Sequence, residues 1–123
     1  MQLEARKYHY DVQEAEDLVS QFTAGKDFAD YQQNPMLRLA IERAFTIIGE
    51  ALAQLARVDA NLASRISDFR NIVGFRNLLT HAYAQIDDRI VWGIVRSKLP
   101  ALIREVAELM SEEDRPQDAK QPL

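Results

Sequence analysis

The chain has 123 residues and a mass of 14.1 kDa, a common size for one globular domain. Hydrophobic residues make up 47% and charged residues 28%, and the low glycine and proline content excludes collagen-like and low-complexity chains. The absence of cysteine excludes a disulfide framework and thiolate chemistry. No apolar run is long enough to span a bilayer, and the N-terminal residues lack the apolar core of a signal peptide. We therefore expect a soluble, cytoplasmic protein with no membrane partner.

The net charge of −4 gives no general preference for nucleic acid. All the positive charges between residues 34 and 89 are nevertheless arginines, the side chain best suited to bidentate phosphate contacts. Solvated helix faces are the simpler interpretation for most of these arginines.

The first part of the chain predicts a helix and a connector. Apolar residues recur at steps of four and three between positions 8 and 22, and Gly25 follows as a C-terminal stop. The connector spans residues 26–34, and we expect its Phe28 and Tyr31 to dock on the bundle.

The second predicted helix is the most secure. Asn34-Pro35 is typical of a helix start, and the apolar positions between residues 37 and 55 hold one face for over five turns. A polar break over residues 58–67, with room for one helical turn, follows it.

Two further helices complete the prediction. The third runs from about residue 68 to about residue 84, and the fourth begins at Asp87-Asp88, where Pro100 is expected to kink or restart it. The sequence thus predicts one all-α domain over residues 1–110, an antiparallel bundle of four main helices. The polar tail, residues 111–123, is predicted to be disordered.

The third helix has apolar residues on two sides. One face carries Phe69, Ile72, Val73, Leu79 and Tyr83, and the other carries Phe75, Leu78 and Ala82. We expect one side to meet the bundle and the other to meet a partner chain.

A polar row separates these faces, and it consists of Arg70, Gly74, Asn77 and His81. A mid-helix Gly74 costs about 1 kcal/mol relative to alanine, unless something approaches the backbone closely there. Arg76 falls within the first apolar face and needs a partner, either a carboxylate such as Glu50 or a ligand phosphate. Each of these residues also has a plain structural interpretation: a solvated histidine, tight helix packing, a local hydrogen bond or an ion pair.

Other chemistries have little support in the sequence. His9 and His81 are the only histidines, so a zinc site is disfavoured. Glu14, Glu16 and Asp17 are predicted to be surface acids without a metal-binding spacing. We therefore expect no metal and no cofactor, which leaves His81 and the arginines to carry any chemistry.

The predicted third helix also carries a known motif. The stretch is Gly74-Phe75-Arg76-Asn77-Leu78-Leu79-Thr80-His81-Ala82-Tyr83. It resembles the signature of HEPN-domain proteins, and more narrowly of the HepT-like toxins, which carry arginine, a polar residue, three residues, histidine, one residue and tyrosine. The flanks are similar as well, at Ile48-Gly49-Glu50-Ala51, Ile86-Asp87, Val91-Trp92 and Leu99-Pro100-Ala101-Leu102. The resemblance covers about residues 8–110, with one departure: Asp68-Phe69 stands where relatives often have a tryptophan.

The resemblance implies a function and a set of partners. HepT-like proteins are metal-independent endoribonuclease toxins of type VII-like toxin–antitoxin systems, and they act as homodimers through the motif helix. A minimal nucleotidyltransferase antitoxin neutralises them and in some members adds AMP to the motif tyrosine, here Tyr83. RNA is the implied substrate, and no DNA partner is expected.

The resemblance also assigns roles to residues of the motif helix. Arg76 and His81 are the implied catalytic pair. The supporting or RNA-binding residues are Asn77, Arg70 and Thr80, and Glu50 is a candidate brace for Arg76.

These residue types suit metal-free RNA cleavage. The 2′-hydroxyl attacks the adjacent phosphorus, imidazole moves a proton near neutral pH, and guanidinium stabilises the phosphorane. One histidine cannot be both base and acid in one step, which a dimer would resolve.

Arg76 and His81 are about 140° apart on an ideal helix. The length of arginine, a helix end near His81 or action across the dimer could each bring them together.

Two alternatives remain open on sequence alone. The chain could be a non-catalytic helical partner of a nucleotidyltransferase, as its substrate or substrate-binding subunit, which suits an acidic chain with an intact Tyr83. It could also be a structural bundle with a degenerate motif.

Overall fold

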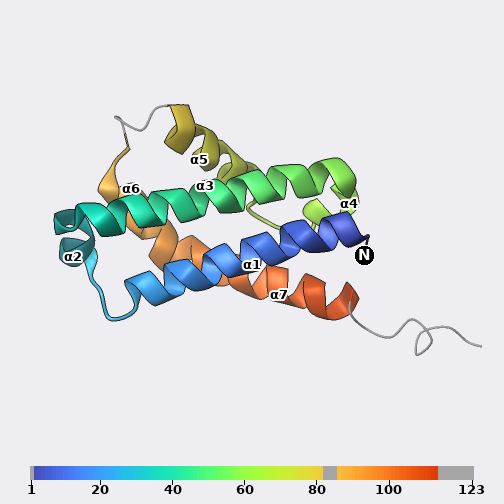
Figure 1. The fold of residues 1–123 in the computed structure, drawn as a ribbon, viewed down its shortest axis with the longest axis horizontal. Helices are drawn as coiled ribbons and strands as arrows, with labels where there is room; N and C mark the ends of the chain where they lie inside the picture. Colours follow the sequence, from blue (N-terminus) through green and yellow to red (C-terminus); the bar gives the residue numbers. More distant parts are fainter. Residues whose placement is uncertain (1, 82–85, 114–123) are drawn as a thin grey trace, which may run out of the picture.

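The computed structural model describes residues 2–81 and 86–113. Within these two ranges every regular element is a helix and no strand occurs, so the all-α prediction is confirmed. The helices pack against one another, with α1, α3 and α7 side by side and α5 lying across α3 (Figure 1).

Helix α1 spans Leu3–Thr23, and the predicted stop follows it, because Gly25 has a φ of 72° that other residues rarely adopt. The connector contains a short helix, α2, at Phe28–Gln33, whose start is fixed by a capping box between Asp27 and Asp30. Tyr31 is completely buried and its ring lies 5.4 Å from that of Trp92, so the predicted docking of the connector is confirmed.

Helix α3 spans Pro35–Val58 and begins where the sequence predicts. The Asn34 side chain accepts a hydrogen bond of 3.1 Å from the Leu37 backbone N–H, and Pro35 occupies the first turn. The predicted single turn in the polar break is α4, Ala60–Ala63, which Asp59 caps in the same manner.

Helix α5 spans Phe69–His81, and α6 spans Asp88–Gly93 after the Asp87 cap. The fourth predicted helix does not break at Pro100. Instead, a π-helical segment, η2 (Ile94–Lys98), joins α6 to α7 (Leu99–Glu113), and the Leu99 N–H donates to the carbonyl of Ile94. A wider π turn just before Pro100 accommodates a residue that lacks an N–H and whose ring crowds the preceding turn.

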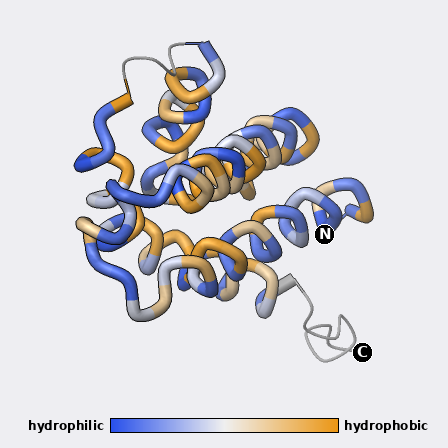
Figure 2. Tube along the Cα trace, turned by 60° about the vertical axis from the view of Figure 1, so that its left-hand side comes forward, coloured by the Kyte–Doolittle hydropathy of each residue, from blue (hydrophilic) through white to orange (hydrophobic). Residues whose placement is uncertain are grey.

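Each long helix is amphipathic. Hydrophobic and hydrophilic residues alternate in short stretches along the trace, as Figure 2 shows. The buried apolar residues form one continuous core shared by α1, α3 and α7, with smaller contributions from α2, α4, α5, α6 and η2. Helix α3 supplies more of this core than any other helix, along the apolar stripe that the sequence predicts.

The structure corrects one prediction about acidic residues. Glu14 and Asp17 are exposed as predicted, but Glu16 is only 2% exposed. Glu16 lies four residues after Val12 and three before Val19, which places it on the buried face of α1. Burial, with a smaller effect of the neighbouring Asp17 charge, raises the pKa of the Glu16 carboxyl from 4.5 to about 8.

The ends of the predicted domain are only partly described. Helix α7 continues to Glu113, three residues beyond the predicted boundary at 110, and residues 114–123 of the predicted tail lie outside the described part. No helix in the described ranges is long and apolar enough to cross a membrane.

Candidate active site

Both apolar faces of α5 make contacts within the chain. Of the described residues of the first face, Leu79 is fully buried, while Phe69, Ile72 and Val73 are half-buried. Phe75, on the second face, packs within the chain, with its ring 5.7 Å from that of Phe45 in an edge-on arrangement. Leu78 of the same face is 39% exposed, so the second face is shared between the bundle and the surface, and the predicted contact with a partner chain stays a prediction.

Arg76 lies on the side of α5 that faces α3. Its Nη1 donates to Glu50 Oε2 at 2.9 Å, and the arginine side chain is 22% exposed while that of Glu50 is 51% exposed. The sequence predicts either a carboxylate or a ligand phosphate as the partner of Arg76. Within the chain, the partner is the carboxylate of Glu50. Nη1 is bound to Glu50 and Nε is buried without a hydrogen-bond partner among the described residues, so a further acceptor would contact the remaining N–H donors of Nη1 and Nη2.

A glycine on α3 permits this arrangement. A Cβ built on Gly49 would lie 2.3 Å from Arg76 Cβ and 2.8 Å from Arg76 Cγ, distances that real Cβ atoms do not tolerate. Gly49 therefore lets α5 cross α3 with the Arg76 stem directly over its backbone. The close packing of α5 at Gly49 was not predicted from the sequence, although an interior glycine in a long helix is itself a signal of close packing.

Two further hydrogen bonds reinforce the pair. Gln54 donates to Glu50 Oε1 at 3.1 Å, so the two carboxylate oxygens have separate partners. The Thr80 hydroxyl donates to the Arg76 carbonyl at 2.8 Å, one turn along α5. Thr80, predicted as a supporting residue, thus contacts the backbone of Arg76.

The polar row of α5 faces solvent. Arg70, Gly74, Asn77 and His81 are all exposed to solvent. A Cβ at Gly74 would meet no atom of the described residues within 4 Å, so this side of the helix is open. The row leaves a helix surface with two cationic or titratable side chains accessible to a ligand.

His81 is the last residue of α5, about 7.5 Å along the helix axis from Arg76. Residues 82–85 lie outside the described part, so the structure does not select among the three ways in which the angular separation between Arg76 and His81 could be closed. Tyr83 lies outside the described residues. Among the residues that the structure describes, histidine and carboxylate side chains form no group of three that could hold a metal ion.

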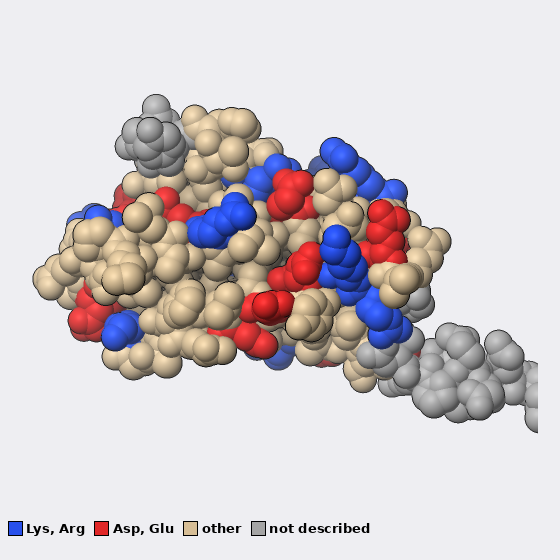
Figure 3. Space-filling view, viewed as in Figure 1, with Lys and Arg blue, Asp and Glu red and all other residues tan. Residues whose placement is uncertain are grey.

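Charges of both signs are mixed over the surface. The face drawn in Figure 3 shows lysine and arginine side chains beside aspartate and glutamate, without a continuous basic patch. On that face, a large basic field therefore does not supply affinity for phosphate.

Comparison with known proteins identifies the family. The sequence profile described as "Ribonuclease HepT-like" matches residues 12–109. "Putative RNase MJ1380" of Methanocaldococcus jannaschii is 33% identical over 103 residues, 84% of this chain and 94% of the relative. "Putative RNase TTE0752" of Caldanaerobacter subterraneus is 31% identical over 83% of this chain and 89% of the relative.

A third relative carries the family name itself. "Probable ribonuclease HepT" of Thermococcus cleftensis is 32% identical over 79% of this chain and 87% of the relative. No solved structure matches the chain significantly. The profile match and these relatives together place the motif helix, with Arg76 and His81, within a recognised sequence family, and the chain belongs to the HepT-like ribonuclease family.

Proposed function

We propose that the protein is a metal-independent endoribonuclease in which Arg76 and His81 act on the scissile phosphate. The observation that carries the proposal is the placement of both side chains on α5: Arg76 is fixed by Glu50, and His81 is exposed at the end of the same helix. The HepT-like relatives named as RNases support it.

The proposed reaction is an internal transfer at phosphorus. His81 removes the proton of the 2′-hydroxyl, whose oxygen forms a bond to the adjacent phosphorus. The bond from phosphorus to the 5′-oxygen breaks, and a second imidazole protonates that oxygen. The products are a 2′,3′-cyclic phosphate and a 5′-hydroxyl, and the Arg76 guanidinium stabilises the negative charge of the phosphorane between them.

A homodimer through α5 would supply the second imidazole. The polar row is open, and Leu78 beside it is 39% exposed, so two copies of α5 could meet with both His81 side chains in one cleft. We include this homodimer in the proposal.

The biological setting that we propose is a toxin of a type VII-like toxin–antitoxin system. Its partner would be a minimal nucleotidyltransferase that neutralises it and transfers AMP to Tyr83. Tyr83 is two residues beyond His81 in the sequence, and a bulky anionic group there would repel the RNA phosphates.

The test is cleavage of RNA by the purified protein in EDTA, with analysis of the product ends. We expect 2′,3′-cyclic phosphate termini, no cleavage of DNA of the same sequence, and loss of cleavage in Arg76→Ala. Arg65→Ala is the matched control, since Arg65 also pairs with a glutamate, Glu112, but lies outside the site. Products ending in a 5′-phosphate would contradict the mechanism.

The second candidate is a non-catalytic substrate or subunit of a nucleotidyltransferase. The net charge of −4 and the mixed charges in Figure 3 favour it, because neither attracts RNA. Expression of the chain alone separates the two candidates. Growth arrest that depends on His81 supports the ribonuclease, whereas normal growth together with AMP transfer to Tyr83 supports the second candidate.

A further inference from the structure

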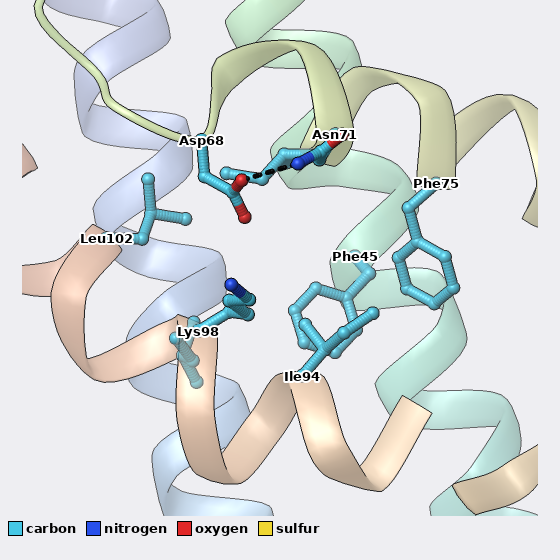
Figure 4. Close-up of a pocket in the computed structure, with 9 residues that line it drawn as sticks. Phe45, Asp68, Asn71, Phe75, Ile94, Lys98 and Leu102 are labelled. Carbon is cyan, nitrogen blue, oxygen red and sulfur yellow. Dashed lines mark hydrogen bonds between the residues drawn. The ribbon is translucent and has the colours of Figure 1, made fainter. Parts of the chain in front are cut away.

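A cavity of about 120 Å³ lies beside the motif helix, on a different side from the exposed polar row. Its walls come from α3, α5, η2 and α7, and Figure 4 shows the side chains that line it. Apolar groups form most of the wall, with three polar side chains at Asp68, Asn71 and Lys98. Nothing in the reaction proposed above uses this cavity.

The helix that contains η2 supplies one wall. Ile94, Lys98 and Leu102 recur at intervals of four residues and all line the cavity. On the opposite wall, Phe75 of α5 and Phe45 of α3 meet edge to face, at a ring separation of 5.7 Å and an interplanar angle of 68°. Aromatic and branched apolar walls of this kind favour a flat, apolar ring.

The volume sets the size of that ring. A cavity of about 150 Å³ lined by apolar side chains holds one benzene molecule. A cavity of about 120 Å³ that opens to solvent therefore encloses at most one six-membered ring, and a fused purine would keep one of its rings outside it.

The polar side chains set its chemistry. Asn71 Nδ2 donates to Asp68 Oδ1 at 2.8 Å, so a carboxylate and an amide are held together at the α5 side of the cavity. Figure 4 shows Lys98 rising from η2 with its ammonium on the side of the cavity toward Asp68. The cavity thus offers oxygen acceptors and an ammonium donor beside its apolar walls, which an apolar side chain of a protein partner would leave unused.

A pyrimidine base combines these properties. It is one flat ring with N–H donors and carbonyl acceptors on its edges, and proteins recognise such bases in single-stranded RNA by stacking and edge hydrogen bonds. We infer that this cavity binds one pyrimidine base of single-stranded RNA.

The position of the cavity links it to the proposed active site, and the inference in this form rests on the proposed function. Phe75 directly precedes Arg76, and His81 lies six residues further, about 9 Å along the helix axis. Because the cavity and His81 also lie on different sides of α5, a base in the cavity belongs to a nucleotide that flanks the cleaved one along the strand, and the cavity selects sequence beside the cleavage point.

The test is binding of short RNA homopolymers to the His81→Ala protein, so that cleavage does not interfere. Oligocytidylate and oligouridylate should bind about tenfold more tightly than oligoadenylate of equal length, by fluorescence anisotropy, a preference within the roughly 5- to 150-fold that one stacked base contributes. Ile94→Phe fills the cavity and should abolish the preference. Ile90→Phe is the matched control, because Ile90 is 56% exposed and does not line the cavity.

A second pair of variants tests the polar edge without changing the core. Lys98→Gln should weaken binding of the pyrimidine oligomers more than that of oligoadenylate, whereas Lys26→Gln, in the exposed turn after α1, should weaken neither. This pair keeps the test decisive if Ile94→Phe does not fold.

The outcomes separate the two proposals. An unchanged pyrimidine preference in both Ile94→Phe and Lys98→Gln, or no preference at all, overturns the cavity assignment whether or not the protein cleaves RNA. Loss of nucleotidyltransferase binding in Ile94→Phe with RNA binding intact also overturns it and assigns the cavity to a protein partner. Absence of cleavage with the predicted preference present contradicts only the proposed function.

Discussion

The Arg76–Glu50 pair joins two side chains with different surroundings. Arg76 is 22% exposed and Glu50 is 51% exposed. A half-exposed carboxylate in an ion pair adds at most about 1 kcal/mol to the free energy of unfolding. The pair therefore contributes more to the orientation of the guanidinium than to stability.

Variants of Glu50 separate its effect on the orientation of Arg76 from its effect on stability. Glu50→Ala should lower the rate of RNA cleavage about tenfold, because it frees Arg76 to rotate, while it changes the free energy of unfolding by no more than about 1 kcal/mol. Glu50→Gln keeps an acceptor and should recover part of the rate. Glu112→Ala, which removes the partner of Arg65, is the control. A full rate in Glu50→Ala would show that Arg76 needs no brace.

Glu16 gives a prediction about pH. Its folded pKa of about 8 lies above the ordinary value of 4.5 for a glutamate carboxyl, so between these values the native state holds a proton that the unfolded state has lost. The free energy of unfolding should therefore fall as pH rises through this window, by about 1.4 kcal/mol per pH unit from this group at most.

Chemical denaturation at several pH values tests this effect. Glu16→Gln should match the native protein near pH 5 and be more stable than it at pH 8, because glutamine stays neutral. Glu14→Gln, at the exposed neighbouring position, should show no pH-dependent difference. Equal pH dependence in both variants would mean that Glu16 is charged in its buried position.

The crossing of α3 and α5 is the contact that positions Arg76 in the candidate active site. The two helices approach closely at Gly49, where only a glycine leaves room for the Arg76 stem. Helix α5 packs mainly on α3, so its position depends on this crossing.

Substitution by alanine should change the free energy of unfolding in opposite directions at Gly49 and at Gly74. Gly49→Ala should lower the free energy of unfolding by about 1–3 kcal/mol and abolish cleavage, because α5 must shift to avoid the new Cβ. Gly74→Ala should raise stability by about 1 kcal/mol, since it has open space and a better helix former. Thermal unfolding of both variants checks this, and a neutral Gly49→Ala would contradict the described crossing.

The beginnings of the helices could be predicted from sequence because capping is local. Asn34 and Asp87 act on backbone groups two or three residues away, and the structure confirms both. The effect of Pro100 could not be predicted, because a π turn upstream is one of several ways to accommodate a proline, and the choice depends on packing of the whole helix.

The candidate site could be predicted in part. The motif predicts Arg76 and His81 as site residues. The helical periodicity of the sequence places Arg76 on an apolar face, where it pairs with Glu50 of α3. The periodicity does not predict that Phe75 packs on Phe45, because the angular position of a residue on one helix does not say where the neighbouring helices lie.

The proposed homodimer forms through the surface of α5 around its polar row. Leu78 lies beside the open polar row and is 39% exposed. Leu78→Glu should place two like charges in the interface, shift the protein to monomer in analytical ultracentrifugation and reduce cleavage. Met36→Glu, at a 77% exposed position at the start of α3, should change neither. An active monomer would contradict the composite cleft.

The central claim is that the α5 histidine takes part in the chemistry of RNA cleavage. The most direct measurement compares the single-turnover rate of RNA cleavage in EDTA for the native protein and for His81→Ala, with circular dichroism to confirm that both are folded. His81 is exposed at the end of α5, so its removal should leave the fold intact. We predict a loss of about a hundredfold or more, the contribution of general acid–base catalysis. Cleavage by His81→Ala at the native rate would contradict the claim.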